Sequence, residues 1–145
     1  MSLGIKVILV YLGVTIVFAL PILAHPAVQF GPVLLTGFPA AIIGLLSLAA
    51  MISIFYGIIK RFKWARKLFI GYYLSFGVLL PTFNLIFLKL NPSIFDDYYR
   101  DTLKLQTLPD HQAIFNMIVH ESILGWAMIA AMSFYLLRKR DYFTK

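Results

Sequence analysis

The polar residues best suited to chemistry lie in the apolar stretch 113–137, where His120 and Glu121 are adjacent. Gln112, Asn116 and His120 follow one another at intervals of four residues, which places them along one face of a helix. Glu121 lies about 100° further around that helix. Because an ionised carboxylate near the middle of a bilayer is costly, we expect Glu121 to be protonated or to be paired inside a helix bundle.

Partners for this polar cluster must come from another apolar stretch at a matching depth. Thr82 and Asn84, just past Pro81, meet this condition, and Pro81 frees a backbone carbonyl nearby. The cluster is interpreted as an interhelical hydrogen-bonded clamp, as a ligand or catalytic pocket in which Glu121 donates or accepts a proton with His120 as its partner, or as a proton or ion path. A path has the least support, because the chain of polar groups that it requires is missing beyond Glu121.

Metal and cofactor chemistry have little support in the sequence. His25 and His111 stand near Asp110 at the ends of apolar stretches, and such ligands suit zinc, but no short-spaced pair accompanies them, so we expect no metal site. The chain has no cysteine, which excludes disulfides, thiolate nucleophiles and cysteine-ligated clusters. Nucleophile elbows, phosphate loops and zinc-protease helices are also absent from the sequence, and the cofactor, if one exists, stays unidentified.

Helices that cross a membrane must position these residues. Hydrophobic residues make up 61% of the 145 and charged residues only 13%, about half of the charged share of soluble domains. A helix needs about 20 apolar residues to cross a bilayer. The stretches 5–24, 34–59, 68–88 and 113–137 qualify. We therefore predict an all-α membrane protein, a single domain folded as an antiparallel bundle of four transmembrane helices.

The distribution of basic residues predicts the orientation of this bundle. Of the 13 lysines and arginines, all but Lys89, Arg100 and Lys104 lie near the two termini or in the second loop. The positive-inside rule then places both termini in the cytoplasm and the protein in the cytoplasmic (inner) membrane. This topology and the attraction to anionic lipid headgroups explain the net charge of +7, so the lipid bilayer is the expected partner and nucleic acid is not.

The outer loop, 89–112, is long enough to carry structure of its own. Ser93 and Asp96 match a capping box after Pro92, and a short amphipathic helix is predicted over 94–105. We interpret it as an interfacial helix on the outer leaflet, with a lid over an outward-facing cavity as the alternative.

The second loop is a basic hairpin expected at the cytoplasmic surface. Trp64 suits the membrane interface, and the neighbouring cations suit anionic headgroups. A site for a partner protein or a specific lipid is the alternative. The residues expected to anchor the hairpin are Arg61, Lys63, Trp64, Arg66 and Lys67.

Three segments, 3–7, 56–67 and 135–143, resemble the small four-span membrane proteins of unknown function that are widespread in bacteria and archaea. In that group a glycine, here Gly57, basic residues and a Trp-Ala-Arg motif, here 64–66, mark the cytoplasmic hairpin. The resemblance implies the four-span topology and carries no activity, substrate or active residue. The pair His120 and Glu121 and the long outer loop depart from the usual pattern of the group.

Two function classes are carried forward from these observations. The first, favoured because catalytic motifs are missing, is a non-enzymatic accessory subunit or a binding module for a lipid-like ligand, with other membrane subunits or a second copy of the chain as possible partners. The alternative is a small intramembrane enzyme acting on a lipid, isoprenoid or quinone, with Glu121 and His120 transferring protons while Asn84 and Asn116 orient the substrate. A transporter or channel is a third hypothesis.

Overall fold

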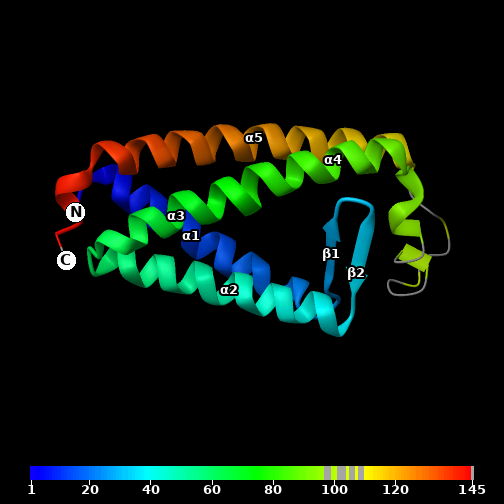
Figure 1. Ribbon diagram of the computed structural model, residues 1–145, viewed down its shortest axis with the longest axis horizontal. Coiled ribbons are helices and arrows are strands. Elements are labelled where there is room, and N and C mark those ends of the chain that lie inside the picture. Colours follow the sequence, from blue (N-terminus) through cyan, green and yellow to red (C-terminus); the bar gives the residue numbers. More distant parts are fainter. Residues whose placement is uncertain (97–98, 101–103, 105–106, 108–109, 145) are drawn as a thin grey trace.

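The computed structural model describes residues 1–96, 99–100, 104, 107 and 110–144. Its four long helical segments run antiparallel to their neighbours in sequence, and both chain ends lie at the same end of the bundle (Figure 1). All four are long and apolar enough to cross a membrane, which confirms the predicted spans. In chain order the helices are α1 (Leu3–Ile22), α2 (Phe38–Ile59), α3 (Lys63–Leu74) continued by α4 (Leu80–Leu90), and α5 (His111–Arg138).

The helices bury little of their apolar surface against one another. Between 11% and 22% of the most apolar window of each helix is buried inside the protein. Large apolar side chains such as Val10, Phe18 and Leu46 point outward instead. In water such a surface would drive aggregation, whereas lipid tails cover it at no cost, so the chain is a multi-pass membrane protein.

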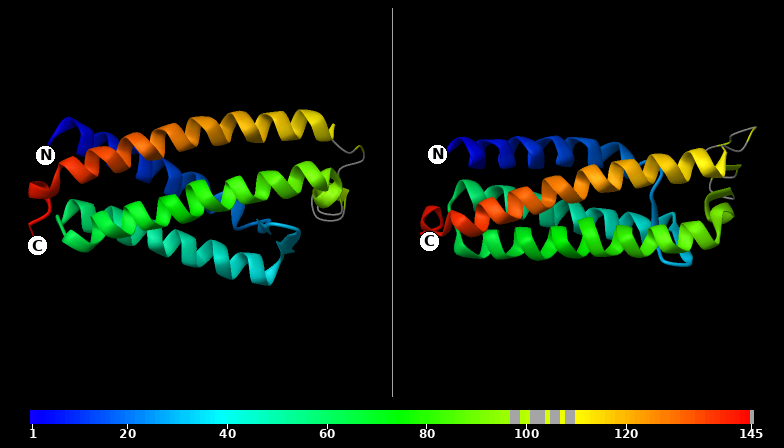
Figure 2. Two further views of the ribbon diagram at one scale, coloured as in Figure 1. Left: turned by 45° about the horizontal axis from the view of Figure 1, so that its top comes forward. Right: turned by 90° about the horizontal axis from the view of Figure 1, so that it is seen from above.

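The densest packing lies in the half of the bundle that carries the termini. Ile8, Ile58, Phe69 and Leu136, from four different helical segments, are essentially inaccessible there. Gly57 adds to this closeness, because a Cβ at its position would lie 2.6 Å from the Cβ of Ala65. Toward the other end the helices diverge, and α1 turns away from α5 (Figure 2).

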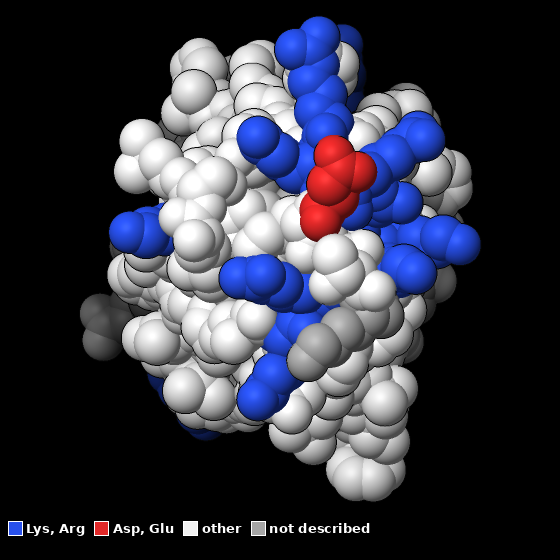
Figure 3. All heavy atoms as spheres, turned by 90° about the vertical axis from the view of Figure 1, so that its left-hand side faces the viewer, with Lys and Arg blue, Asp and Glu red and all other residues white. Residues whose placement is uncertain are grey.

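Lysines and arginines gather at the packed end of the bundle (Figure 3). They come from the start of α1, the hairpin between α2 and α3, and the end of α5. Asp141 is the acidic residue among them, in a short 3₁₀ turn, η4 (Arg140–Tyr142), that follows α5. This end is therefore strongly cationic.

A π-helical turn, η1 (Ser75–Leu79), joins α3 to α4 into one long span. The amide of Leu80 donates to the carbonyl of Ser75, five residues earlier, immediately before Pro81. A proline ring clashes with the carbonyl four residues earlier in a regular α-helix, and the wider π turn accommodates it. Within this turn Gly77 faces α5, since a Cβ there would lie 2.6 Å from Cδ1 of Ile129.

A β-hairpin between α1 and α2 corrects the predicted boundary of the second span. Strands β1 (Ala27–Phe30) and β2 (Val33–Thr36) pair antiparallel, so the first residues of the predicted span 34–59 form a strand and the helix begins at Phe38. Gly31 and Pro32 form the turn, and Gly31 has φ +57°, which suits the first position of a tight hairpin turn. The two strands satisfy each other's backbone groups, as a non-helical segment near lipid must.

Asn84 ties this hairpin to α4. Its side-chain oxygen accepts from the amide of Gly31 at 2.8 Å, and its side-chain nitrogen donates to the carbonyl of Gln29 at 2.7 Å. The hairpin thus spans the gap between α2 and α4 where the helices diverge (Figure 1). It acts as a wedge that fixes their separation.

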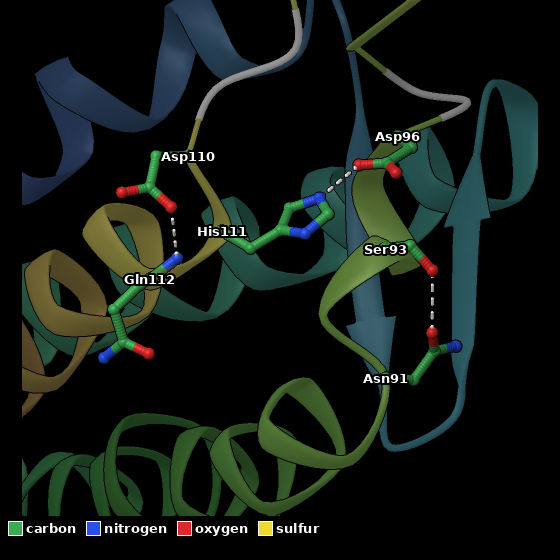
Figure 4. Close-up of polar contacts among 6 residues, drawn as sticks. All are labelled: Asn91, Ser93, Asp96, Asp110, His111 and Gln112. Carbon is green, nitrogen blue, oxygen red and sulfur yellow. Dashed lines mark hydrogen bonds and ion pairs between the residues drawn. The ribbon is translucent and has the colours of Figure 1, made fainter.

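In the described part of the outer loop the cap predicted at Ser93 does not form, while Asp96 and residues 99–100 are helical. Pro92–Phe95 form a 3₁₀ turn, and the Ser93 hydroxyl donates to the side chain of Asn91 instead of capping a helix (Figure 4). Much of the predicted helix 94–105 lies outside the described residues. His111, the first residue of α5, contacts a carboxylate oxygen of Asp96 at 2.8 Å and ties the loop to the helix.

Replacing Asn84 with alanine is expected to lower the free energy of unfolding by about 1–2 kcal/mol, since the change removes both side-chain bonds to the hairpin. Thr82→Val is the matched control, because the Thr82 hydroxyl donates within its own helix, to the carbonyl of Val78. This variant should change stability by less than about 0.5 kcal/mol. Unfolding in mixed detergent micelles measures both values. Equal losses for the two variants would contradict the wedge.

Candidate functional site

An open groove of about 290 Å³ lies between α1, the α3–α4 span and α5. It forms beside the π turn, in the region where α1 separates from α5 (Figure 2). At about 1.5 Å per helical residue, Glu121 lies about 15 Å from the start of α5 at His111, and Tyr73 lies about 15 Å from the start of α3 at Lys63, at the other end of the bundle. The groove therefore lies at mid-membrane depth. Its lining residues are Tyr11, Tyr73, Gly77, Pro81, Ile118, Glu121, Ser122, Gly125, Trp126 and Ile129.

Polar atoms in this groove are left without partners. The hydroxyl of Tyr73 and the indole nitrogen of Trp126 are both buried, and neither finds a hydrogen-bond partner among the described residues. A buried polar group without a partner costs about 1–3 kcal/mol. Glu121 and Ser122 add a carboxyl and a hydroxyl to the same wall. Residues that carry several hydrogen-bonding groups thus line the groove, and two of these groups are buried without a described partner.

The other side chains that line the groove are mainly apolar and pack closely against one another. The rings of Tyr11 and Tyr73 lie with their centroids 6.0 Å apart, which joins α1 to α3 at the floor. Gly77 lets α5 approach closely, since a Cβ there would lie 2.6 Å from Cδ1 of Ile129. Because Pro81 has no N–H, the helical ladder of hydrogen bonds is interrupted beside the groove. An apolar body bound here would contact aliphatic and aromatic carbon, with the polar groups at one side.

The structure separates the two residues predicted to act as an acid–base pair. Both side chains are exposed on α5, and of the two only Glu121 lines the groove. No hydrogen bond or ion pair joins either side chain to the described part of the chain. Their offset of about 100° around the helix accounts for the separation.

The other predicted members of the polar cluster are also apart from Glu121. Asn84 holds the β-hairpin, and Thr82 bonds within its own helix. Gln112 donates to the side chain of Asn116 at 2.9 Å along the surface of α5. The predicted interhelical clamp around Glu121 is therefore not formed among the described residues, and Asn84 clamps the hairpin instead.

The candidate metal ligands stay dispersed. Among the described residues, no group of three or more histidine, cysteine, aspartate or glutamate side chains is placed to hold a metal ion. His111 pairs with Asp96, while the carboxylate of Asp110 accepts from the amide of Gln112 and caps α5 (Figure 4). Both residues thus make structural contacts at the start of α5. His25 follows α1, before the hairpin.

The residues proposed to anchor the cytoplasmic hairpin lie at the cationic end of the bundle. The rings of Phe62 and Trp64 stack with centroids 5.9 Å apart, so Trp64 is held in place beside the turn. Arg61, Lys63 and Lys67 are exposed, and Arg66 is partly buried. Their contact with lipid headgroups stays a prediction.

Sequence reasoning missed Tyr73 and Trp126. Both were counted as apolar residues of a span, although each carries a hydrogen-bonding atom that needs a partner away from the membrane surface. Ser122, directly after Glu121, was also passed over. The sequence feature that could have identified them is a tyrosine or tryptophan, with its hydroxyl or indole N–H, far from both ends of an apolar span. Only the packing of three helical segments shows that these atoms meet in one groove.

Comparisons with protein-family models, curated proteins and solved structures give no match for this chain.

Two adjacent tyrosines test whether the groove contains an unsatisfied hydroxyl. The hydroxyl of Tyr73 has no described partner, so Tyr73→Phe is expected to leave stability unchanged or to raise it by up to about 1 kcal/mol. Tyr72 shares a hydrogen bond with Ser47, so Tyr72→Phe should lower stability by about 0.6–1 kcal/mol. Unfolding of both variants in the same micelles gives the comparison. A loss for Tyr73→Phe as large as that for Tyr72→Phe would show that the Tyr73 hydroxyl is already paired.

Proposed function

We propose that this protein binds a lipid-soluble molecule with a hydrogen-bonding head in the groove between α1, α3–α4 and α5, without converting it chemically. The observation that carries the proposal is the meeting of two buried, unpartnered polar atoms, the Tyr73 hydroxyl and the Trp126 indole nitrogen, beside Glu121 in an apolar groove. A ligand that satisfies these atoms recovers free energy that the unoccupied groove has lost.

The chemistry of the groove indicates what the head must offer. The indole nitrogen of Trp126 only donates, and the hydroxyl of Tyr73 donates or accepts. Such a set suits a head that carries carbonyl oxygens. A volume of about 290 Å³ accommodates one ring and a short length of chain. A quinone on an isoprenoid tail meets both conditions, with the tail continuing into the surrounding lipid.

Binding is favoured over catalysis because the predicted proton-transfer pair is divided. Glu121 reaches the groove, whereas His120 lies outside it, so a bound molecule meets a single titratable carboxyl. The enzyme alternative keeps Glu121 as its acid and lacks the second group needed to return the proton. A permanent membrane subunit that holds a quinone or lipid needs no such group.

We further propose that both termini face the cytoplasm of a cell whose cytoplasmic membrane houses the protein. The support is the concentration of cations around the end that carries the termini (Figure 3). Anionic headgroups and the positive-inside rule favour this end on the cytoplasmic side.

A quinone carrying one isoprenoid unit serves as the probe for the groove. The protein has two tryptophans, so Trp64→Phe leaves Trp126 as the fluorescent reporter inside the groove. We expect saturable quenching by the quinone in detergent micelles. In this background Tyr73→Phe and Glu121→Leu should each weaken the affinity about tenfold, the effect of one lost hydrogen bond.

Tyr72→Phe is the matched control for that titration and should bind as tightly as the parent. Quenching that never saturates, or that is identical in all variants, would reflect partitioning into the micelle and contradict a binding site. Recovery of a chemically altered quinone from the parent protein, but not from Glu121→Gln, would instead establish the enzyme.

The orientation has its own test, which the absence of cysteine makes simple. Thr107 and Thr144 are exposed and belong to opposite ends of the bundle. A maleimide that does not cross membranes should label Thr107→Cys in intact cells, and Thr144→Cys only after the membrane is opened. The reverse pattern would place the termini outside.

A further inference from the structure

A second cavity, of about 360 Å³, opens at the cationic end of the bundle, far from the groove. Arg61, from the hairpin between α2 and α3, lines it together with Arg138 and Lys139 at the end of α5. Its other lining residues are Met1, Ser2, Asp141 and Tyr142. No ion pair is described for any of the three cations, and the described ion pair of the chain is that of His111 and Asp96 at the opposite end. Segments distant in sequence thus bring three unpaired positive charges to one cavity.

The backbone at Arg61 adopts a conformation that favours glycine. Its φ is +62°, and the turn that ends α2 has the bonding pattern of a Schellman motif. The amide of Phe62 donates to the carbonyl of Gly57 at 2.9 Å, and the amide of Arg61 donates to that of Ile58 at 3.2 Å. Glycine occupies this left-handed position at least cost. An arginine here is strained, and such strain is often found where the side chain has a function.

The side chain of Arg61 is braced from one face. Its guanidinium carbon lies 5.1 Å from the centroid of the Tyr142 ring, and the hydroxyl of Tyr142 donates to the carbonyl of Ile58 at 3.2 Å. Arg138 lies similarly over the ring of Phe134, at 4.5 Å. Stacking uses the flat face of a guanidinium and leaves the N–H groups on its edges available. Two such edges and one ammonium group match the oxygens of a phosphate.

We infer that this cavity binds the phosphate of an anionic phospholipid headgroup. The cavity lies at the end of four helices that are long and apolar enough to cross a membrane, the end at which lipid phosphates would meet them. Asp141 adds a negative charge to the wall, which disfavours a doubly charged phosphate monoester and accepts hydrogen bonds from a hydroxylated headgroup. A singly charged phosphodiester, such as that of phosphatidylglycerol, fits better than phosphatidic acid. This site is independent of the groove at mid-membrane depth.

Native mass spectrometry of the detergent-solubilised protein, titrated with phosphatidylglycerol, tests the inference. Arg61→Gly is expected to keep or raise the melting temperature, because glycine suits the turn, and to weaken binding about tenfold through loss of a charged hydrogen-bond donor. Lys104→Gly is the matched control, since Lys104 also has a positive φ, +57°, and lies in the outer loop. It removes the same charge and should leave the affinity unchanged.

The comparison lipids and a soluble anion complete the experiment. Phosphatidylcholine should bind more weakly than phosphatidylglycerol, and Asp141→Asn should improve binding of phosphatidic acid more than that of phosphatidylglycerol. Unchanged affinity in Arg61→Gly, or an equal loss in Lys104→Gly, would overturn the site in favour of general charge attraction. Displacement of the lipid by an equal concentration of inorganic phosphate would overturn a lipid as the ligand. If Arg61→Gly does not fold, Arg138→Gln is measured in its place, and the same affinity as wild type would overturn the site.

Discussion

The pairing of backbone polar groups away from water is the constraint on which this structure depends. Helices satisfy it within themselves, and the two irregular places near membrane depth satisfy it by special means. The hairpin pairs its own strands and donates its turn amide, at Gly31, to Asn84. The π turn before Pro81 re-routes a bond that proline cannot make. The hairpin and the π turn each interrupt regular α-helix. Each also changes the spacing of the helices around it, which a bundle of uninterrupted helices would not do.

That geometry leads directly to the groove. Glycines allow the helices to converge at the end with the termini, while the hairpin holds α2 and α4 apart at the other end. Between these two limits α1 cannot follow α5 along its whole length. Tyr73 and Trp126 line the space left beside the π turn, and their buried polar atoms have no described partner. The polar atoms are therefore unpaired as a consequence of helix divergence, and not through an isolated packing fault.

Composition and apolar run length were enough to predict four spans in one domain, because crossing a bilayer demands length and hydropathy more than any particular residue. Apolar run length could not predict the hairpin, because Val33–Thr36 are mostly apolar like the helix that follows and were therefore counted into the second span. Depth along a span was predictable for Glu121, but helix rotation was not. Rotation decides that His120 lies outside the groove and that Asn84 meets Gln29, and it depends on packing between segments far apart in sequence.

The unequal spacing of the helices also means that the protein occupies different areas at its two ends. α2 and α5 lie closer together where the chain ends meet than where the hairpin sits (Figure 1). A molecule that occupies more area in one leaflet than in the other behaves as a wedge in the bilayer. It will prefer membrane whose curvature relieves that asymmetry.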